Sequence, residues 1–382
     1  MRGRLAEAIV WLAAVILPAR LRDWGRAMAV ELAAIERPGA ALAFALGCLV
    51  GALRQTVSSH VHLSQALEGT PEMHLARDLL RHPRGLAAVC AIGAISLGLA
   101  YLTAAGAPLS YLASNAAALV IGLLAVGVLS EARQIWRFAG GVVALALASL
   151  ILLTSLFGVS ADGATRWISA GGIILQPALS LVPIVALCFA RERNAASLIA
   201  VLITALALAL QPDRAMAGAL AAGMAALALA RLDRTVLVAL GAALAAFTAT
   251  LVRVDASSAM PFVDRILYTS FEVHPLAGFA VLAGAALMLV PAIVGYIRDT
   301  DHRSIYAAFG AIWLAVILAA ALGNYPTPLV GYSGSAILGY LISLLGLPRR
   351  AATHGIARDG GSSQSEPEEQ QLDLRVGLTT AA

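Results

Sequence analysis

Gly158–Pro177 reads Gly-Val-Ser-Ala-Asp-Gly-Ala-Thr-Arg-Trp-Ile-Ser-Ala-Gly-Gly-Ile-Ile-Leu-Gln-Pro and separates two long apolar runs of the chain. The first run covers 138–157, and the second ends at 190, where an Arg-Glu-Arg triplet follows. A loop surrounded by lipid would leave its backbone N–H and C=O groups unpaired. We therefore expect this stretch to lie at a membrane surface or to line a cavity within the protein.

The polar residues of this stretch make it a candidate site as well as a connection. Asp162 and Arg166 form a charge pair, and Trp167 is a ring suited to a membrane interface. The Asp-Gly pair that begins at Asp162 favours a turn, and the proline after Gln176 favours the start of a helix. The sequence thus predicts a polar, turning segment between two apolar helices.

The composition of the whole chain is that of an integral membrane protein. Of its 382 residues 60% are hydrophobic and only 13% are charged, and the mean hydropathy is +0.84. Soluble domains carry about 25% charged residues, so a soluble fold is excluded. The net charge of +4 does not indicate nucleic-acid binding, because the arginines occur in short clusters between apolar runs rather than in one stripe.

From residue 86 onward the apolar segments are regular, and each is near the ~20 residues that span a bilayer as a helix. Ten segments are predicted, at approximately 86–103, 111–130, 138–157, 173–190, 195–210, 215–230, 235–252, 276–297, 304–322 and 328–347. Arginine clusters mark every second connection, which the positive-inside rule assigns to the cytoplasm. The intervening loops are then outward, around 104–110, 158–172, 211–214, 253–275 and 323–327. Both ends of the ten-helix core are expected in the cytoplasm.

The two ends of the chain differ from this core. Residues 1–83 are predicted to form an N-terminal element, with short apolar runs at 5–17 and 38–53 and an amphipathic helix at 20–37 suited to a membrane interface. Whether the two short runs span the membrane is left open. Residues 349–382 lack apolar periodicity and are predicted to be a disordered cytoplasmic tail.

No metal site is predicted from the histidines or cysteines. The polar stretch 55–84 contains a His-x-His pair but no third ligand at helical spacing, so we favour a structural role for its histidines. These are His60, His62, His74 and His82. The three cysteines, Cys48, Cys90 and Cys188, all lie inside apolar runs, which indicates neither a disulfide framework nor a zinc site.

Residues 162–168, Asp-Gly-Ala-Thr-Arg-Trp-Ile, and the Gln-Pro at 176–177 resemble the signature loop of the SEDS family. This family comprises the RodA and FtsW proteins of bacterial elongation and division. Its loop reads Asn-Gly-Ala-Lys/Arg-Arg-Trp-Ile and is followed by Gln-Pro-Ser-Glu. The chain departs from the family after Gln-Pro, where Ala178 and Leu179 stand in place of Ser-Glu.

Two further stretches resemble the family in the same order. Gln211-Pro212-Asp213 corresponds to the start of its Gln-Pro-Asp-Leu-Gly motif, and 328–335, with Tyr332 and Ser335, corresponds to Pro-Phe-Ile/Val-Ser-Tyr-Gly-Gly-Ser. An ionisable residue at such a break usually faces a cavity. The alternative for Asp213 is a local ion pair with Arg214 that caps the next helix, and the alternative for 328–335 is close helix packing by small residues.

The main departure from the family lies before the eighth predicted helix. Active members end this loop with Glu-x-His-Thr-Asp-Phe-Ile-Phe-Ala, in which the Asp is the proposed catalytic base or metal ligand. Here Glu272 and His274 align with that motif, but Leu276 stands at the Asp position. A leucine can neither accept a proton nor hold a metal ion. Asp264, in the same loop, is the substitute carboxylate that we would test.

The fold predicted from these observations is all-α: a polytopic membrane protein with a ten-helix SEDS-type bundle at 84–348. The resemblance implies a protein of peptidoglycan synthesis, cell shape or cell division in the bacterial inner membrane. It further implies lipid II as substrate and a single-pass transpeptidase-type partner. The site residues would be Asp162, Arg166, Trp167, Gln176, Gln211, Asp213, Glu272, His274, Tyr332 and Ser335.

Whether the protein is an enzyme is left open by the sequence. A peptidoglycan glycosyltransferase would join a lipid-linked acceptor sugar to a lipid-pyrophosphate donor, with Arg166 near the pyrophosphate, and only such activity would call for a divalent metal ion. The alternatives are a catalytically inactive relative that acts as a membrane scaffold or partner subunit, and a lipid or solute transporter. Leu276 favours the scaffold over the enzyme.

Overall fold

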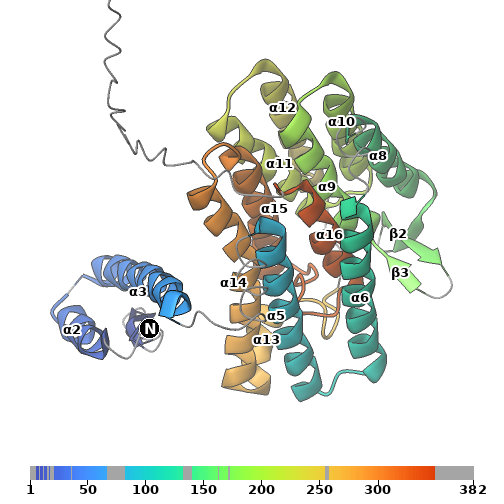
Figure 1. Cartoon of the computed structure of the whole chain (residues 1–382). Coiled ribbons are helices and arrows are strands. Elements are labelled where there is room, and N and C mark those ends of the chain that lie inside the picture. Colours follow the sequence, from blue (N-terminus) through green and yellow to red (C-terminus); the bar gives the residue numbers. More distant parts are fainter. Residues whose placement is uncertain are drawn as a thin grey trace, which may run out of the picture. The chain divides into compact units, whose positions relative to one another are not determined.

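The computed structural model describes residues 6–7, 9–11, 13–14, 17, 21–35, 37–66, 82–131, 140–161, 163–170, 173–253 and 258–348. Between 82 and 348 the described residues form a bundle of ten longer helices and one short one (Figure 1). The longer ones are α5 (Pro83–Ala104), α6 (Leu109–Glu131), α8 (Gly140–Phe157), α9 (Pro177–Glu192), α10 (Ala195–Leu210), α11 (Arg214–Ala230), α12 (Arg234–Leu251), α14 (Pro275–Arg298), α15 (Arg303–Leu322) and α16 (Gly334–Ser343). The predicted all-α, ten-helix architecture is confirmed.

Six of these helices, α5, α6, α8, α12, α14 and α15, are long and apolar enough to cross a membrane. Helices α10, α11 and α16 are apolar but shorter. Length and composition therefore make the chain a multi-pass membrane protein. Helix α16 is shorter than predicted: the last predicted segment begins at 328, but α16 begins at Gly334, after a turn formed by the third motif.

The connections between the helices alternate between two ends of the bundle. One end, called the motif end, carries 105–108, 158–176, 211–213, 252–274 and 323–333. The other, called the arginine end, carries 193–194, 231–233, 299–302 and the turn η2 (Leu344–Gly346). All three motifs identified in the sequence thus lie at one end of the bundle.

At the motif end, two elements differ from the irregular loops expected from the sequence. The stretch after α8 contains three short antiparallel strands, β1 (Val159–Ala161), β2 (Ala164–Ala170) and β3 (Ile173–Leu175). The loop after α12 contains a short helix, α13 (Ile266–Val273). Strand pairing gives hydrogen-bond partners to the backbone groups of this stretch, as the sequence analysis required of a segment between two membrane helices.

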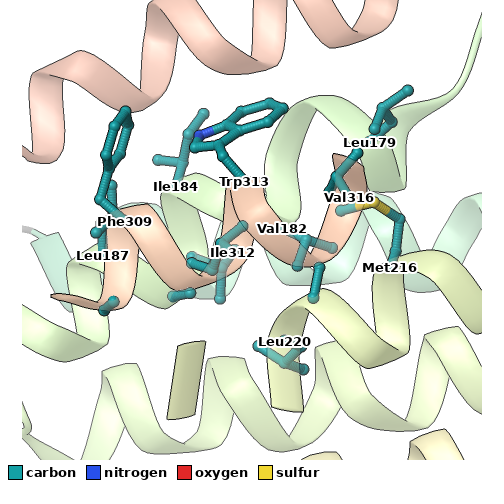
Figure 2. Packing of buried hydrophobic residues seen from close by; sticks show 14 of the residues in the cluster. Leu179, Val182, Ile184, Leu187, Met216, Leu220, Phe309, Ile312, Trp313 and Val316 are labelled. Atoms are coloured by element: carbon teal, nitrogen blue, oxygen red, sulfur yellow. The ribbon is translucent and has the colours of Figure 1, made fainter. Parts of the chain in front are cut away.

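Helix α9 is the centre of the bundle. Its residues from Pro177 to Ala190 are buried almost without exception, as expected of a helix that is apolar all round. Figure 2 shows its side chains packed against those of α11 and α15, including Met216, Ile312 and Trp313. Helix α16 also crosses close to α9: a Cβ placed on Gly339 would lie 2.6 Å from the carbonyl oxygen of Leu179. The core is therefore built around the helix that follows the polar stretch 158–176.

The N-terminal element contains two described helices, α2 (Arg22–Ala33) and α3 (Pro38–Ala66). On α2, which lies within the predicted amphipathic helix 20–37, Leu32 is buried, whereas Trp24 is 61% exposed. Helix α3 continues past the predicted apolar run 38–53, because no glycine or proline follows until Gly69. The side chains of His60, His62 and His74, and the tail 349–382, lie outside the described residues, so these predictions stay untested.

Candidate functional site

Three motif residues from three separate connections meet at the motif end. The side-chain amide of Gln176, at the start of α9, donates from Nε2 to Asp213 Oδ2 over 2.9 Å. The other carboxylate oxygen of Asp213 accepts the backbone N–H of Met216 over 3.1 Å and so caps α11. The backbone N–H of Gln176 donates to Ser335 Oγ over 2.9 Å. One hydrogen-bond network thus joins the starts of α9, α11 and α16.

Arg166 on β2 binds the break between α10 and α11. Its Nε donates to the carbonyl oxygen of Gln211 over 3.2 Å, and its Nη2 donates to that of Pro212 over 2.5 Å. The arginine is only 6% exposed, and Pro212 has a φ of 27°. The forked guanidinium therefore pairs two carbonyls at a strained turn, where helical partners are missing.

Gln211 is fully buried and extends the network to α8. Its Nε2 donates to the carbonyl oxygen of Ile151 over 3.0 Å, while its Oε1 has no hydrogen-bond partner among the described residues. Asp213 is also fully buried, and Ser335 is 7% exposed. Residues of the first two motifs are therefore largely occupied with one another and with backbone groups.

Asn115 on α6 belongs to this end of the bundle and was not identified from the sequence. Its Nδ2 donates to the carbonyl oxygen of Gly331 over 2.8 Å, and its Oδ1 accepts the N–H of Ser333 over 3.2 Å. The side chain is fully buried. A lone amide in a long apolar segment was the available signal, because such a residue must find a partner within the protein.

Tyr332 lies in an aromatic cluster beside this turn. Its ring stacks on that of Tyr111, with 3.8 Å between centroids and an interplanar angle of 7°. The rings of Phe262 and Tyr111 form a T-shaped pair, with 6.2 Å between centroids and an interplanar angle of 80°. The N–H of Tyr332 also donates to the carbonyl oxygen of Phe262 over 2.8 Å. The loop before α13 and the turn before α16 are thus held together by rings and backbone.

Asp264 is part of the same pairing of loops. It forms an isolated antiparallel bridge with Pro326, and its Oδ2 accepts the N–H of Met260 over 2.8 Å. Burial raises the pKa of the Asp264 carboxyl, while the hydrogen bond from Met260 and the charge of Arg265 act in the opposite direction. A half-buried carboxylate with a raised pKa is a candidate general base.

The other predicted residues make no contact with this network among the described residues. Glu272 and His274 are exposed, and Leu276 is 71% exposed at the start of α14. The Nδ1 atom of His274 accepts the N–H of Leu276 over 3.1 Å and caps α14. Trp167 is partly buried on β2, and Asp162 lies outside the described residues.

The family resemblance would place a divalent metal ion near a carboxylate of this end. Among the described residues, no three His, Cys, Asp or Glu side chains are grouped so that they could hold a metal ion. The described residues therefore do not fit a metal site built from three such side chains.

Two solved structures of the rod shape determining protein RodA of Thermus thermophilus are similar to this chain. A RodA mutant superposes with a TM-score of 0.51 at 21% identity, covering 68% of this chain and 94% of RodA. A second RodA structure gives a TM-score of 0.50 at 20% identity, with 68% and 93% covered. No family model and no curated protein matches the chain.

The shared part has the size of the ten-helix bundle, since 68% of 382 residues is about 260 and the bundle runs from 83 to 348. Within that bundle the three motifs follow one another in the order expected and lie at one end. The chain therefore has a SEDS-like fold of the RodA type.

Proposed function

We propose that the protein is an inner-membrane subunit of bacterial cell-wall synthesis that does not itself polymerise peptidoglycan. Its RodA-type fold supports a place in this machinery. We infer the lack of polymerase activity from Leu276, which occupies the position of the proposed catalytic Asp and is 71% exposed. Its side chain offers no group that can take a proton from a sugar hydroxyl.

The geometry of the motif residues supports the same conclusion. Asp213 is fully buried, with one carboxylate oxygen on Met216 N and the other on Gln176 Nε2. A carboxylate in this arrangement caps a helix and joins two helices, and it is not placed to deprotonate a substrate. Arg166 likewise pairs carbonyls of the chain. These residues preserve the shape of the motif end, which suits a scaffold.

A second candidate function is a polymerase that uses Asp264 as its base. The raised pKa of this carboxyl favours it, because a base works best when its pKa approaches the working pH. Asp264 also lies on loop 252–274, the loop that precedes α14. In this proposal lipid II would be the substrate: the acceptor sugar hydroxyl would transfer its proton to Asp264 while its oxygen bonds to the anomeric carbon of the donor, and the bond from that carbon to the pyrophosphate would break, releasing the lipid pyrophosphate.

Polymerisation of lipid II by the full-length protein, with a divalent metal present, separates the two candidates. We expect no glycan product from the wild type, since a general base contributes about 10²–10⁴ in rate. Product that disappears in Asp264→Asn would overturn the proposal and establish Asp264 as the base. Asn keeps the acceptor for Met260 N, so this variant removes the charge without removing the turn.

Leu276 is tested in the same assay by Leu276→Asp, with Leu276→Asn as the matched control. Activity gained only by the Asp variant would identify a motif end that lacks nothing but its base. The partner is tested by co-expression with a single-pass transpeptidase of the same organism. We expect the two to co-purify in detergent, and a complex that fails to form would contradict the scaffold role.

A further inference from the structure

The N-terminal element contains an apolar cavity that the proposed function does not use. The cavity has a volume of about 310 Å³. Trp24 and Met28 line it from α2, where they lie one turn apart. Phe44 and Cys48 line it from α3 with the same spacing, and Leu17 adds a further apolar side chain. The two helices thus turn apolar faces toward a common space.

Two glycines keep the α3 side of this cavity open. Gly47 and Gly51 lie one turn apart and both line the cavity. A Cβ added to either glycine would meet no atom within 4 Å outside its own stretch of helix. Close packing against a neighbouring helix therefore does not explain them, although a glycine inside a helix is destabilising relative to alanine. An apolar molecule lying against the two glycines would account for both.

The lining of the cavity suits an apolar ligand rather than a polar one. Among the described residues no charged side chain lines it, and the side-chain polar groups there are the Trp24 indole N–H and the Cys48 thiol. Asp23 and Arg26 lie on the exposed part of α2 and pair with each other over 2.7 Å. Water fits the cavity poorly, because a buried water needs about two to four polar partners.

We propose that this cavity binds one acyl chain of a membrane phospholipid. The chain is a multi-pass membrane protein, and an amphipathic helix such as α2 lies where headgroups meet acyl chains. Trp24, 61% exposed beside the cavity, is of the residue type enriched at that level. The volume is near the lower end of the range for ligand pockets, about 300–1,000 Å³, which suits a single acyl chain. This lipid site is independent of both candidate functions proposed above.

Photocrosslinking from the lipid tests the proposal. The full-length protein is placed in nanodiscs that contain phosphatidylethanolamine with a diazirine on one acyl chain, and crosslinked residues are located by mass spectrometry. We expect a higher yield on residues 44–51 of α3 than on the exposed face of α6, where Val120, Ile121 and Leu124 report ordinary lipid contact. A yield on 44–51 no higher than on α6 would overturn the proposal, as it would if the bundle or a second copy covered the cavity.

Variants that fill the cavity assign the crosslinks to it. Gly47→Leu and Gly51→Leu each place a side chain in the open space and displace at least about two methylenes of the bound chain, which should lower the yield about tenfold relative to α6. The matched control is Gly39→Leu, because Gly39 is also an exposed glycine of α3 with no atom within 4 Å of an added Cβ but lies outside the cavity. Unchanged yields in both filling variants would overturn the proposal.

Two further measurements keep the test decisive. If the leucine variants fail to fold, the double variant Gly47→Ala, Gly51→Ala replaces them, since alanine favours the helix and still adds two methyl groups to the cavity. It should lower the yield on 44–51 at least about threefold, and an unchanged yield would overturn the proposal. Undecaprenyl phosphate added at the same mole fraction as the probe should leave the crosslinks unchanged. Loss of the crosslinks would identify an isoprenoid chain as the occupant and overturn the assignment to phospholipid.

Discussion

Gln176 and Asp213 lie 37 residues apart, and a 2.9 Å hydrogen bond from Nε2 to Oδ2 joins them at the motif end. Gln176 precedes α9, the central helix, and Asp213 precedes α11, which packs beside it. The bond therefore connects two helix starts that each follow a break in an apolar segment. In a protein whose buried polar groups cannot reach water, such a bond sets how the helices align.

Replacing Asp213 should be costly. Asp213→Ala removes the cap on Met216 N and leaves the Gln176 amide without its partner, which we expect to destabilise the protein by about 2–3 kcal/mol. Asp233→Ala is the matched control, since Asp233 caps α12 through Val236 N but is 39% exposed, and about 1 kcal/mol is expected. Thermal unfolding in detergent measures both, and equal losses would show that the bond to Gln176 adds nothing.

Arg166 should be more important for stability than its surface counterpart. Arg166→Gln leaves the carbonyl of Gln211 without a donor in a buried turn and the carbonyl of Pro212 with only the N–H of Arg214, at an expected cost of about 2 kcal/mol. Arg191→Gln is the comparison, because exposed Arg191 makes one bond, from Nη1 to Gly346 O. Limited proteolysis should cut Arg166→Gln faster than Arg191→Gln. The reverse order would contradict a role for Arg166 at the break.

Asn115 should behave as a structural connection rather than as a solvated side chain. Asn115→Ala leaves Gly331 O and Ser333 N without partners, which is expected to cost about 2–4 kcal/mol. Exposed Asn194, which caps α10 through Ser197 N, is the control, and its replacement by Ala should cost about 1 kcal/mol. Unfolding midpoints compare the two variants, and a smaller effect at Asn115 would argue against its two bonds.

Asp264 should make the stability of the folded protein depend on pH in the acidic range. Burial raises its pKa above the ordinary value of 3.8, so the folded state binds this proton more tightly than the unfolded state. Its contribution to stability is then full below pH 3.8 and is lost as pH rises through the folded pKa. The unfolding midpoint of the wild type, measured relative to that of Asp264→Asn at the same pH, should therefore fall as the pH rises from 3.8 through the folded-state pKa of Asp264. If the midpoint difference between wild type and Asp264→Asn increased with pH instead, the pKa of Asp264 would be lowered in the folded state, which would contradict this prediction.

The orientation of the bundle in the membrane is testable by labelling. Arginines predict that the motif end faces outward and the arginine end faces the cytoplasm. In a background without the native cysteines, Ser169→Cys should react with an impermeant maleimide added outside, and Leu232→Cys should not. Both positions are exposed in the structure, so accessibility does not confound the comparison. Labelling of position 232 and not of position 169 would show that the bundle has the opposite orientation in the membrane.

The number and order of the helices were determined by the sequence alone. Apolar runs of nearly constant length, separated by arginines or by the three motifs, lead to ten helices because a run of ~20 apolar residues can span the lipid with its backbone hydrogen bonds formed within one helix. The order of the motifs also predicted the RodA-type fold. The position of Leu276 could likewise be read from residues 272–280, because alignment with a motif needs no coordinates.

Only the tertiary structure decided which side chains meet. Asp213 has Gln176 and Met216 as partners, and Asn115 has Gly331 and Ser333, more than 200 residues away. The hydropathy of the sequence indicates that a buried polar group needs a hydrogen-bond partner, but which residue becomes that partner depends on how the helices pack in three dimensions. The stacking of Tyr111 on Tyr332 has no local sequence signal for the same reason: the two rings come together only because α6 and the turn before α16 end at one place.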